Sequence, residues 1–228
     1  MQRHFDQDLS VLREKLLTMA SHAEQSVAMA IKALVGRDDD LARQVKAADA
    51  TIDQFEIDMD DLGIKLLALK APVAGDLRLI TMAMKISQNL ERVGDEATTI
   101  ARRVLELNQE APLKPFVDLP RMAGIAVEML CGSLESFINM NTVQARDIIQ
   151  RDRAVDDLNK QVHRELIGFM VENPRTITRG LNLMVISKSL ERIADHATNI
   201  AEEIVFLCEG RDIRHATHLA AIQTDQTP

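Results

Sequence analysis

Carboxylates spaced four residues apart recur along this 228-residue chain, and they are its clearest candidates for chemistry. Glu91 and Asp95 form one pair, and Glu191 and Asp195 form another pair 100 residues later. Positions four apart share one face of an α-helix, so each pair places two negative charges side by side. Such a like-charge pair costs a helix about 0.2–0.5 kcal/mol. An unfavourable arrangement that is repeated favours a role in binding a cation.

Another stretch of each half carries the same kind of pair. Asp49 and Asp53 correspond to Asp152 and Asp156 at an offset of 103 residues. In the first half this stripe continues with two more acids, whereas the second half has an amide and an imidazole at those places. These four positions are Glu56 and Asp60, and Asn159 and His163. A second-half site would therefore be less negative and more tolerant of zinc.

Clustered carboxylate oxygens are hard ligands that suit iron, manganese, magnesium or calcium, and zinc becomes an option through His163 or His196. The alternative is a solvated helix face, with Arg92 and Arg192 neutralising part of the charge. The eight candidate metal ligands are Asp49, Asp53, Glu91, Asp95, Asp152, Asp156, Glu191 and Asp195.

The halves that carry these acids are copies of one another. Residues 84–101 align without gaps with residues 184–201, and 11 of the 18 positions are identical. A match this dense over one fixed offset indicates a tandem duplication. Each copy therefore repeats the same acidic pairs.

Apolar residues recur at steps of three and four almost everywhere, which is typical of helices in a bundle. The first helix is expected to stop near Gly36 and the third to span 74–108. In the second half the breaks lie at Asn141-Thr142 and Asn173-Pro174, and the last helix ends near Cys208. The second helix is expected to end at 70–72 and to bury one apolar stripe: Val45, Ile52, Phe55, Met59, Leu62, Leu66 and Leu69.

These patterns predict an all-α fold of six long helices, arranged as two tandem three-helix bundles related by duplication. The first bundle is expected over residues 1–110, and a proline-rich linker over 111–120. The second bundle is expected over 121–209, and a polar C-terminal tail, frayed or a short helix at most, over 210–228. On a helical wheel Glu91 points away from the apolar stripe of its helix, so the acids are expected to face outward.

Composition narrows the classes of function. A formal net charge of −8 disfavours nucleic acid and anionic lipid as partners, because both require clustered cations. No apolar stretch approaches the length of a membrane helix, so direct membrane insertion is not expected. The two cysteines, Cys131 and Cys208, form no C-x-x-C pair and are expected to be reduced core residues of a cytoplasmic protein. No motif argues for catalysis.

The duplicated segments Leu90 to Asp95 and Leu190 to Ala201 resemble the signature of the PhoU family. The resemblance includes Phe5 to Leu9 and Lys70 to Arg78, and it covers about residues 3–208. It implies a cytoplasmic, non-enzymatic negative regulator of the phosphate-starvation response. Such a regulator links the ATPase subunit of the phosphate ABC transporter to the phosphate-sensing histidine kinase and forms homodimers or larger oligomers.

The resemblance also implies multinuclear metal clusters on the bundle surface, held by the eight acids named above. The metal would be divalent or ferric, and iron, zinc, manganese and magnesium are the candidates. Two other functions remain open from the residues. A metal-dependent bundle enzyme or metal store would need ligands that point inward, and a structural coiled-coil or chaperone-like protein would bind no metal.

Overall fold

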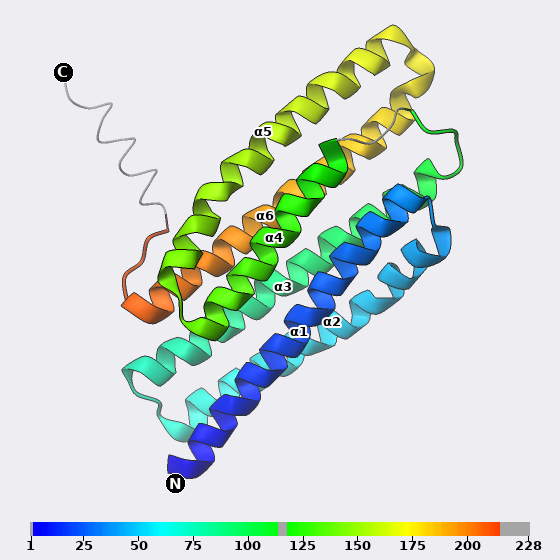
Figure 1. Cartoon of the computed structure of the whole chain (residues 1–228). Helices are drawn as coiled ribbons and strands as arrows, with labels where there is room; N and C mark the ends of the chain where they lie inside the picture. The colour runs from blue at the N-terminus through cyan, green and yellow to red at the C-terminus, as the bar shows by residue number, and fades with distance from the viewer. Residues whose placement is uncertain (1, 114–117, 215–228) are drawn as a thin grey trace, which may run out of the picture.

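Six long α-helices and one short 3₁₀-helix make up the computed structural model, which describes residues 2–113 and 118–214 (Figure 1). The all-α prediction is confirmed, because this part of the chain contains no strand. The helices are α1 (Gln2–Gly36), α2 (Asp39–Lys70), α3 (Ala74–Leu107), α4 (Asp118–Asn139), α5 (Thr142–Glu172), η1 (Pro174–Thr176) and α6 (Ile177–Glu209).

The helices form two triplets that lie side by side with their long axes aligned (Figure 1). Helices α1, α2 and α3 pack on one another, and so do α4, α5 and α6. The triplets meet where α3 packs against α6 and α1 against α4. Consequently α2 and α5 lie on opposite flanks, and each touches only the helices of its own triplet.

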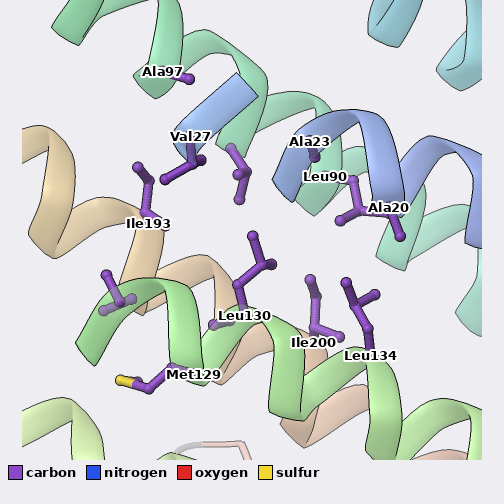
Figure 2. Close-up of a cluster of buried hydrophobic side chains, with 14 of the residues drawn as sticks. Ala20, Ala23, Val27, Leu90, Ala97, Met129, Leu130, Leu134, Ile193 and Ile200 are labelled. Atoms are coloured by element: carbon purple, nitrogen blue, oxygen red, sulfur yellow. The ribbon is translucent and has the colours of Figure 1, made fainter. Parts of the chain in front are cut away.

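One continuous apolar core runs through both triplets. Figure 2 shows where the triplets meet: Val27 of α1 and Leu90 of α3 face Leu130 of α4 and Ile193 of α6. Small residues such as Ala23 let α1 approach its neighbours closely. The two copies are thus fixed to each other by burial of apolar surface, which is the main stabilising force in folding.

Local chemistry sets where the helices begin. The Asp38 side chain accepts a hydrogen bond from Leu41 N at 2.9 Å and caps α2. Asn141 caps α5 in the same way by accepting from Val143 N. In these two turns a side chain therefore satisfies the first free amides, whereas α3 begins after Val73 without a side-chain cap.

The first helix ends where expected but through a different residue. Gly36 remains helical, and Arg37 adopts the left-handed conformation with φ of 53°. An arginine is unusual there, because the left-handed region crowds its Cβ. Its guanidinium is held by two carbonyls at the end of α3, Leu107 O at 3.2 Å and Glu110 O at 2.6 Å. These contacts explain why Arg37 rather than Gly36 makes the turn.

Three expectations need correction. Leu69 was expected in the core, but it is 69% exposed, because it lies in the last turn of α2, where the hairpin ends. Cys208 is exposed near the end of α6, whereas Cys131 is partly buried; both are free thiols. Helix α4 begins at Asp118, inside the expected 111–120 linker, because a first-turn acid suits a helix N-terminus. Most of the expected tail, from 215 on, lies outside the described residues.

Along the described part of the chain, no helix combines the length and the apolar character that crossing a bilayer requires.

Replacing Leu90 by Ala is expected to lower the free energy of unfolding by about 2–5 kcal/mol, because the side chain is fully buried between the triplets. Denaturant titration followed by circular dichroism measures this change. Ile64→Ala is the matched control, since Ile64 is exposed on α2 and its loss should cost about 0.5 kcal/mol or less. Equal losses in both variants would contradict the shared core.

Candidate functional site

The first carboxylate cluster consists of Asp49 and Asp53 on α2 and Glu91 and Asp95 on α3. Packing of α2 on α3 brings the two pairs together, so that each charge acts on the others. Burial, and then repulsion from Asp95, raises the pKa of Glu91 to about 7, with smaller contributions from Glu56 and Asp53. Burial also raises the pKa of Asp49, and Asp53 and Asp95 add to this effect. These electrostatic effects place the four acids near one another at the contact between α2 and α3.

The second carboxylate cluster consists of Asp152 and Asp156 on α5 and Glu191 and Asp195 on α6. Burial raises the pKa of Asp195 to about 7, and repulsion from Glu191 and Asp152 contributes next. Burial likewise raises the pKa of Asp152, followed by repulsion from Asp156 and Glu191. The duplication therefore yields two clusters with the same electrostatic character. Each holds more negative charge than its surroundings solvate well.

Apart from Asp53, which is exposed, the acids are partly or fully buried in the seams between neighbouring helices. The Glu91 side chain is only 16% exposed, whereas that of Asp95 is 48% exposed. Glu191 is buried, with 9% of its surface exposed. The expectation that these acids face outward is therefore wrong for the two glutamates. A helical wheel considers one helix alone, but α3 and α6 each pack against three other long helices, so few of their faces are open.

Different cations accompany the two clusters. Arg92 lies 3.3 Å from Glu91 Oε2 and 3.2 Å from Asp95 Oδ2, so it neutralises part of the first cluster, as considered above. Arg192 does not play this part in the second cluster, because its Nη1 lies 3.0 Å from Glu96 Oε1 of the other triplet. Lys188 contacts Glu191 instead.

The side chains that continue each stripe differ in their partners. Burial raises the pKa of Glu56, and repulsion from Asp60 adds to it, so Glu56 extends the first cluster. In the second half Asn159 Oδ1 accepts a hydrogen bond from Ser187 at 2.6 Å. The His163 ring lies against Met184 O, with Nε2 at 3.4 Å. Asn159 and His163 therefore bind α6 rather than extend the second cluster.

His196 lies between the triplets rather than on an open surface. Its Nδ1 lies 3.0 Å from Asn89 Oδ1 of α3, and burial lowers its pKa, which favours the neutral ring. This places its ring in the contact between the halves.

Two buried acids were not found from the sequence. Glu96 and Glu203 are almost fully buried where α3 meets α6, and each pairs with a cation of the other triplet. Lys85 Nζ lies 3.2 Å from Glu203 Oε1. One feature of the sequence could have singled them out, because neither acid has an acidic counterpart in the other repeat. His196 stands 100 residues after Glu96, and Arg103 stands 100 residues before Glu203.

The clusters have oxygen atoms available for a cation. Asp152 Oδ1 is buried and accepts no hydrogen bond from any described residue. Glu91 Oε2 is also buried without a hydrogen bond, although Arg92 Nε is near. Among residues 2–113 and 118–214, however, no three histidine, cysteine, aspartate or glutamate side chains form a group ready to hold an ion. Metal binding would require the side chains to rotate toward a common centre.

Comparison with known proteins identifies both repeats. The model of the PhoU domain matches residues 16–104 and again residues 119–204. A phosphate-specific transport system accessory protein PhoU homolog of Pseudomonas aeruginosa is 38% identical over 214 residues, covering 93% of this chain and 88% of the relative. The homolog of Aquifex aeolicus is 40% identical over 208 residues, covering 91% and 94%.

Solved structures agree with this assignment. The crystal structure of PhoU from Pseudomonas aeruginosa superposes with a TM-score of 0.89 at 38% identity, over 91% of this chain and all of that one. The phosphate transport system regulatory protein PhoU from Streptococcus pneumoniae gives a TM-score of 0.84 at 30% identity, over 92% and 99%.

The raised pKa of Glu91 has a consequence for stability. When the pKa of an acid is higher in the folded chain than in the unfolded chain, that acid destabilises the folded protein increasingly as pH rises from the unfolded-state pKa to the folded-state pKa. For Glu91 this window runs from the ordinary value of 4.5 to about 7. Glu91→Gln should therefore gain stability relative to wild type between pH 5 and pH 8, by about 1 kcal/mol after allowance for solvent screening.

Urea titrations at both pH values measure this difference. Glu14→Gln is the control, because Glu14 is an exposed acid on α1. An advantage of Glu91→Gln that is the same at pH 5 and pH 8 would contradict the electrostatic description of the cluster.

Proposed function

Because the chain belongs to the PhoU family, we propose that it is a non-enzymatic accessory protein that regulates phosphate uptake. One observation carries this proposal: both repeats match the family domain, and relatives named as phosphate transport accessory proteins align over nearly their whole length.

In its finer form, the proposal makes the protein a negative regulator of the phosphate-starvation response. It acts as a cytoplasmic homodimer that contacts the ATPase subunit of the phosphate ABC transporter and the phosphate-sensing histidine kinase. The acidic clusters support contacts with basic surfaces, since charge complementarity steers association. Transporter state would change how the adaptor engages the kinase and bias the kinase away from phosphorylation.

Metal binding at the two carboxylate clusters is a further part of the proposal. The first site would use Asp49, Asp53, Glu91 and Asp95. A divalent or ferric ion would supply positive charge where burial and mutual repulsion raise the pKa values of Glu91 and Asp49. The buried, unpartnered oxygen of Asp152 fits such an ion in the second half. The second site would use Asp152, Asp156, Glu191 and Asp195.

The alternative function, a metal-dependent bundle enzyme or metal store, has less support. It requires ligands inside the bundle, surrounded on all sides. Asp95 is about half exposed, and both clusters lie at the edges between a flanking helix and a central one. Metal at these places is better suited to shaping a surface than to an enclosed reaction centre.

Deletion of the gene should switch on phosphate-starvation genes in phosphate-rich medium, because the kinase would lose its restraint. A reporter fused to a starvation promoter measures this, and the wild-type gene supplied in trans should restore repression. Continued repression in the deletion strain would overturn the proposed function.

Metal content provides a separate test. Protein purified without chelators should contain iron, zinc, manganese or magnesium by elemental analysis. Glu91→Ala and Asp195→Ala should each lose the metal of one cluster, because each removes one carboxylate ligand, and the double variant should lose both. Glu14→Ala, an exposed acid outside the clusters, should retain the full content. Unchanged metal in both single variants would remove these acids from the ligand set.

A further inference from the structure

The contact between α3 and α6 contains two equivalent places that have diverged. These helices run antiparallel, so Lys85 of α3 meets Glu203 of α6 at 3.2 Å. The equivalent pair at the second place is found by adding the repeat offset of 100 to Lys85 and subtracting it from Glu203. These positions are occupied by Val185 and Arg103. The acid at one place is therefore an arginine at the other. The lysine at the first place is an apolar valine at the second.

At the first place the chain fills the position with its own residues. After α6 the chain turns at Gly210, whose φ is 66°, and lies close to Arg78 of α3. Ile213 then packs against the core, and Arg214 Nη1 donates to Glu203 Oε1 at 3.1 Å. An apolar residue followed by a cation thus covers an acidic position.

The second place remains an open groove of about 560 Å³ between the end of α3 and the beginning of α6, which lie at the upper right of Figure 1. Leu181, Met184 and Val185 form its apolar floor, and Arg103, His163 and Lys188 stand around it. In the other repeat, the positions that correspond to these three basic residues hold two acids and an amide, which are Glu203, Asp60 and Gln88. All three differences make this groove more basic than its counterpart.

The segment after α3 is held elsewhere. Arg179 donates to Ala111 O at 2.8 Å and pairs with Glu110 at 3.2 Å. Lys114, which corresponds in sequence to Arg214, carries the same charge as Arg103 and so is the wrong partner for it. By sequence, the residue equivalent to Arg214 therefore does not offer Arg103 a complementary charge.

An amide also lines the groove. Asn182 is 6% exposed, and its side-chain nitrogen and oxygen are not among the buried atoms left without a hydrogen bond. Its counterpart in the first repeat is Met82, a buried apolar residue. The amide therefore gives this groove a hydrogen-bonding group that the equivalent position of the first repeat lacks.

The acids near the groove do not cancel its basic character. Glu106 pairs with Arg103 at 3.0 Å, and Glu191 pairs with Lys188. Both are pairs within one helix, and Arg103, Glu106 and Lys188 keep between about a third and a half of their side-chain surface exposed. The Arg103–Glu106 pair is exposed on both sides and contributes little, so a ligand carboxylate can share or exchange Arg103, whereas Lys188 stays with the nearly buried Glu191.

We propose that this groove binds a short acidic segment of a protein partner, with an apolar side chain on the floor of Leu181, Met184 and Val185 and a following carboxylate on Arg103. The other place in the α3–α6 contact provides the pattern, because there an apolar residue, Ile213, and a residue of opposite charge, Arg214, cover Glu203. The inference builds on the proposed adaptor function, since an adaptor requires a surface for its partner.

Two labelled peptides test the proposal by fluorescence anisotropy with the full-length protein. One copies residues 209–214, Glu-Gly-Arg-Asp-Ile-Arg, and the other ends in Ile-Glu. Wild type should bind the Ile-Glu peptide about tenfold or more tightly than the Ile-Arg peptide, because close charge pairs at interfaces are strongly coupled. Failure of wild type to prefer the acidic peptide would overturn the proposal.

Variants locate the binding. Arg103→Glu should reverse the preference toward the Ile-Arg peptide, a gain that misfolding cannot produce. Arg13→Glu makes the same charge change at an exposed position in the first half of α1, whose N-terminus lies at the opposite end of the bundle from the groove (Figure 1), and should leave the preference unchanged. Equal effects of both variants, or none from Arg103→Glu, would place binding elsewhere. Deletion of the gene tests the regulatory function independently, so the two failures are distinguishable.

Discussion

Helices α3 and α6 are each enclosed by three other long helices, and this enclosure governs the remainder of the structure. Apolar residues such as Leu90 and Ile193 fill the region between the triplets and leave little open surface on either helix. Polar residues on these helices must therefore lie in narrow seams. Carboxylates placed there are poorly solvated, and their pKa values rise toward neutrality. The unusual chemistry of the acids is thus a consequence of how the two copies pack.

Local signals in the sequence were sufficient to predict the helices and the fold class. They did not predict which helices pack against one another. Asp38 and Asn141 mark helix starts because a cap depends only on residues two or three positions away. The prediction that Glu191 faces outward was wrong, because a helical wheel contains no information about which neighbours enclose a helix. Leu69 was expected to be buried because it continues the apolar stripe of α2. It lies in the last turn of that helix, where the packed hairpin ends, and is therefore exposed.

The same difference explains which parts of the site could be predicted. The eight acids were identified because the duplication repeats them at fixed offsets. Glu96 and Glu203 escaped notice because their cationic partners come from the other triplet, and no pattern within one helix reveals such a pair. Under the alternative of a solvated helix face, Arg192 would neutralise part of the second cluster, but it pairs across the seam with Glu96. Proximity in sequence was a poor guide to charge pairing in this crowded region.

The pairs across the seam fix how α3 and α6 align. Sliding one helix along the other would separate Arg192 from Glu96 and leave a nearly buried acid without its cation, which is unfavourable. Lys85 and Glu203 impose the same alignment from the other end of the contact. Because this alignment also sets Arg103 opposite Val185, the charge difference between the two repeats is held at a defined place. Duplication supplied two equivalent positions, and substitution at one of them gave each half a different surface on the same framework.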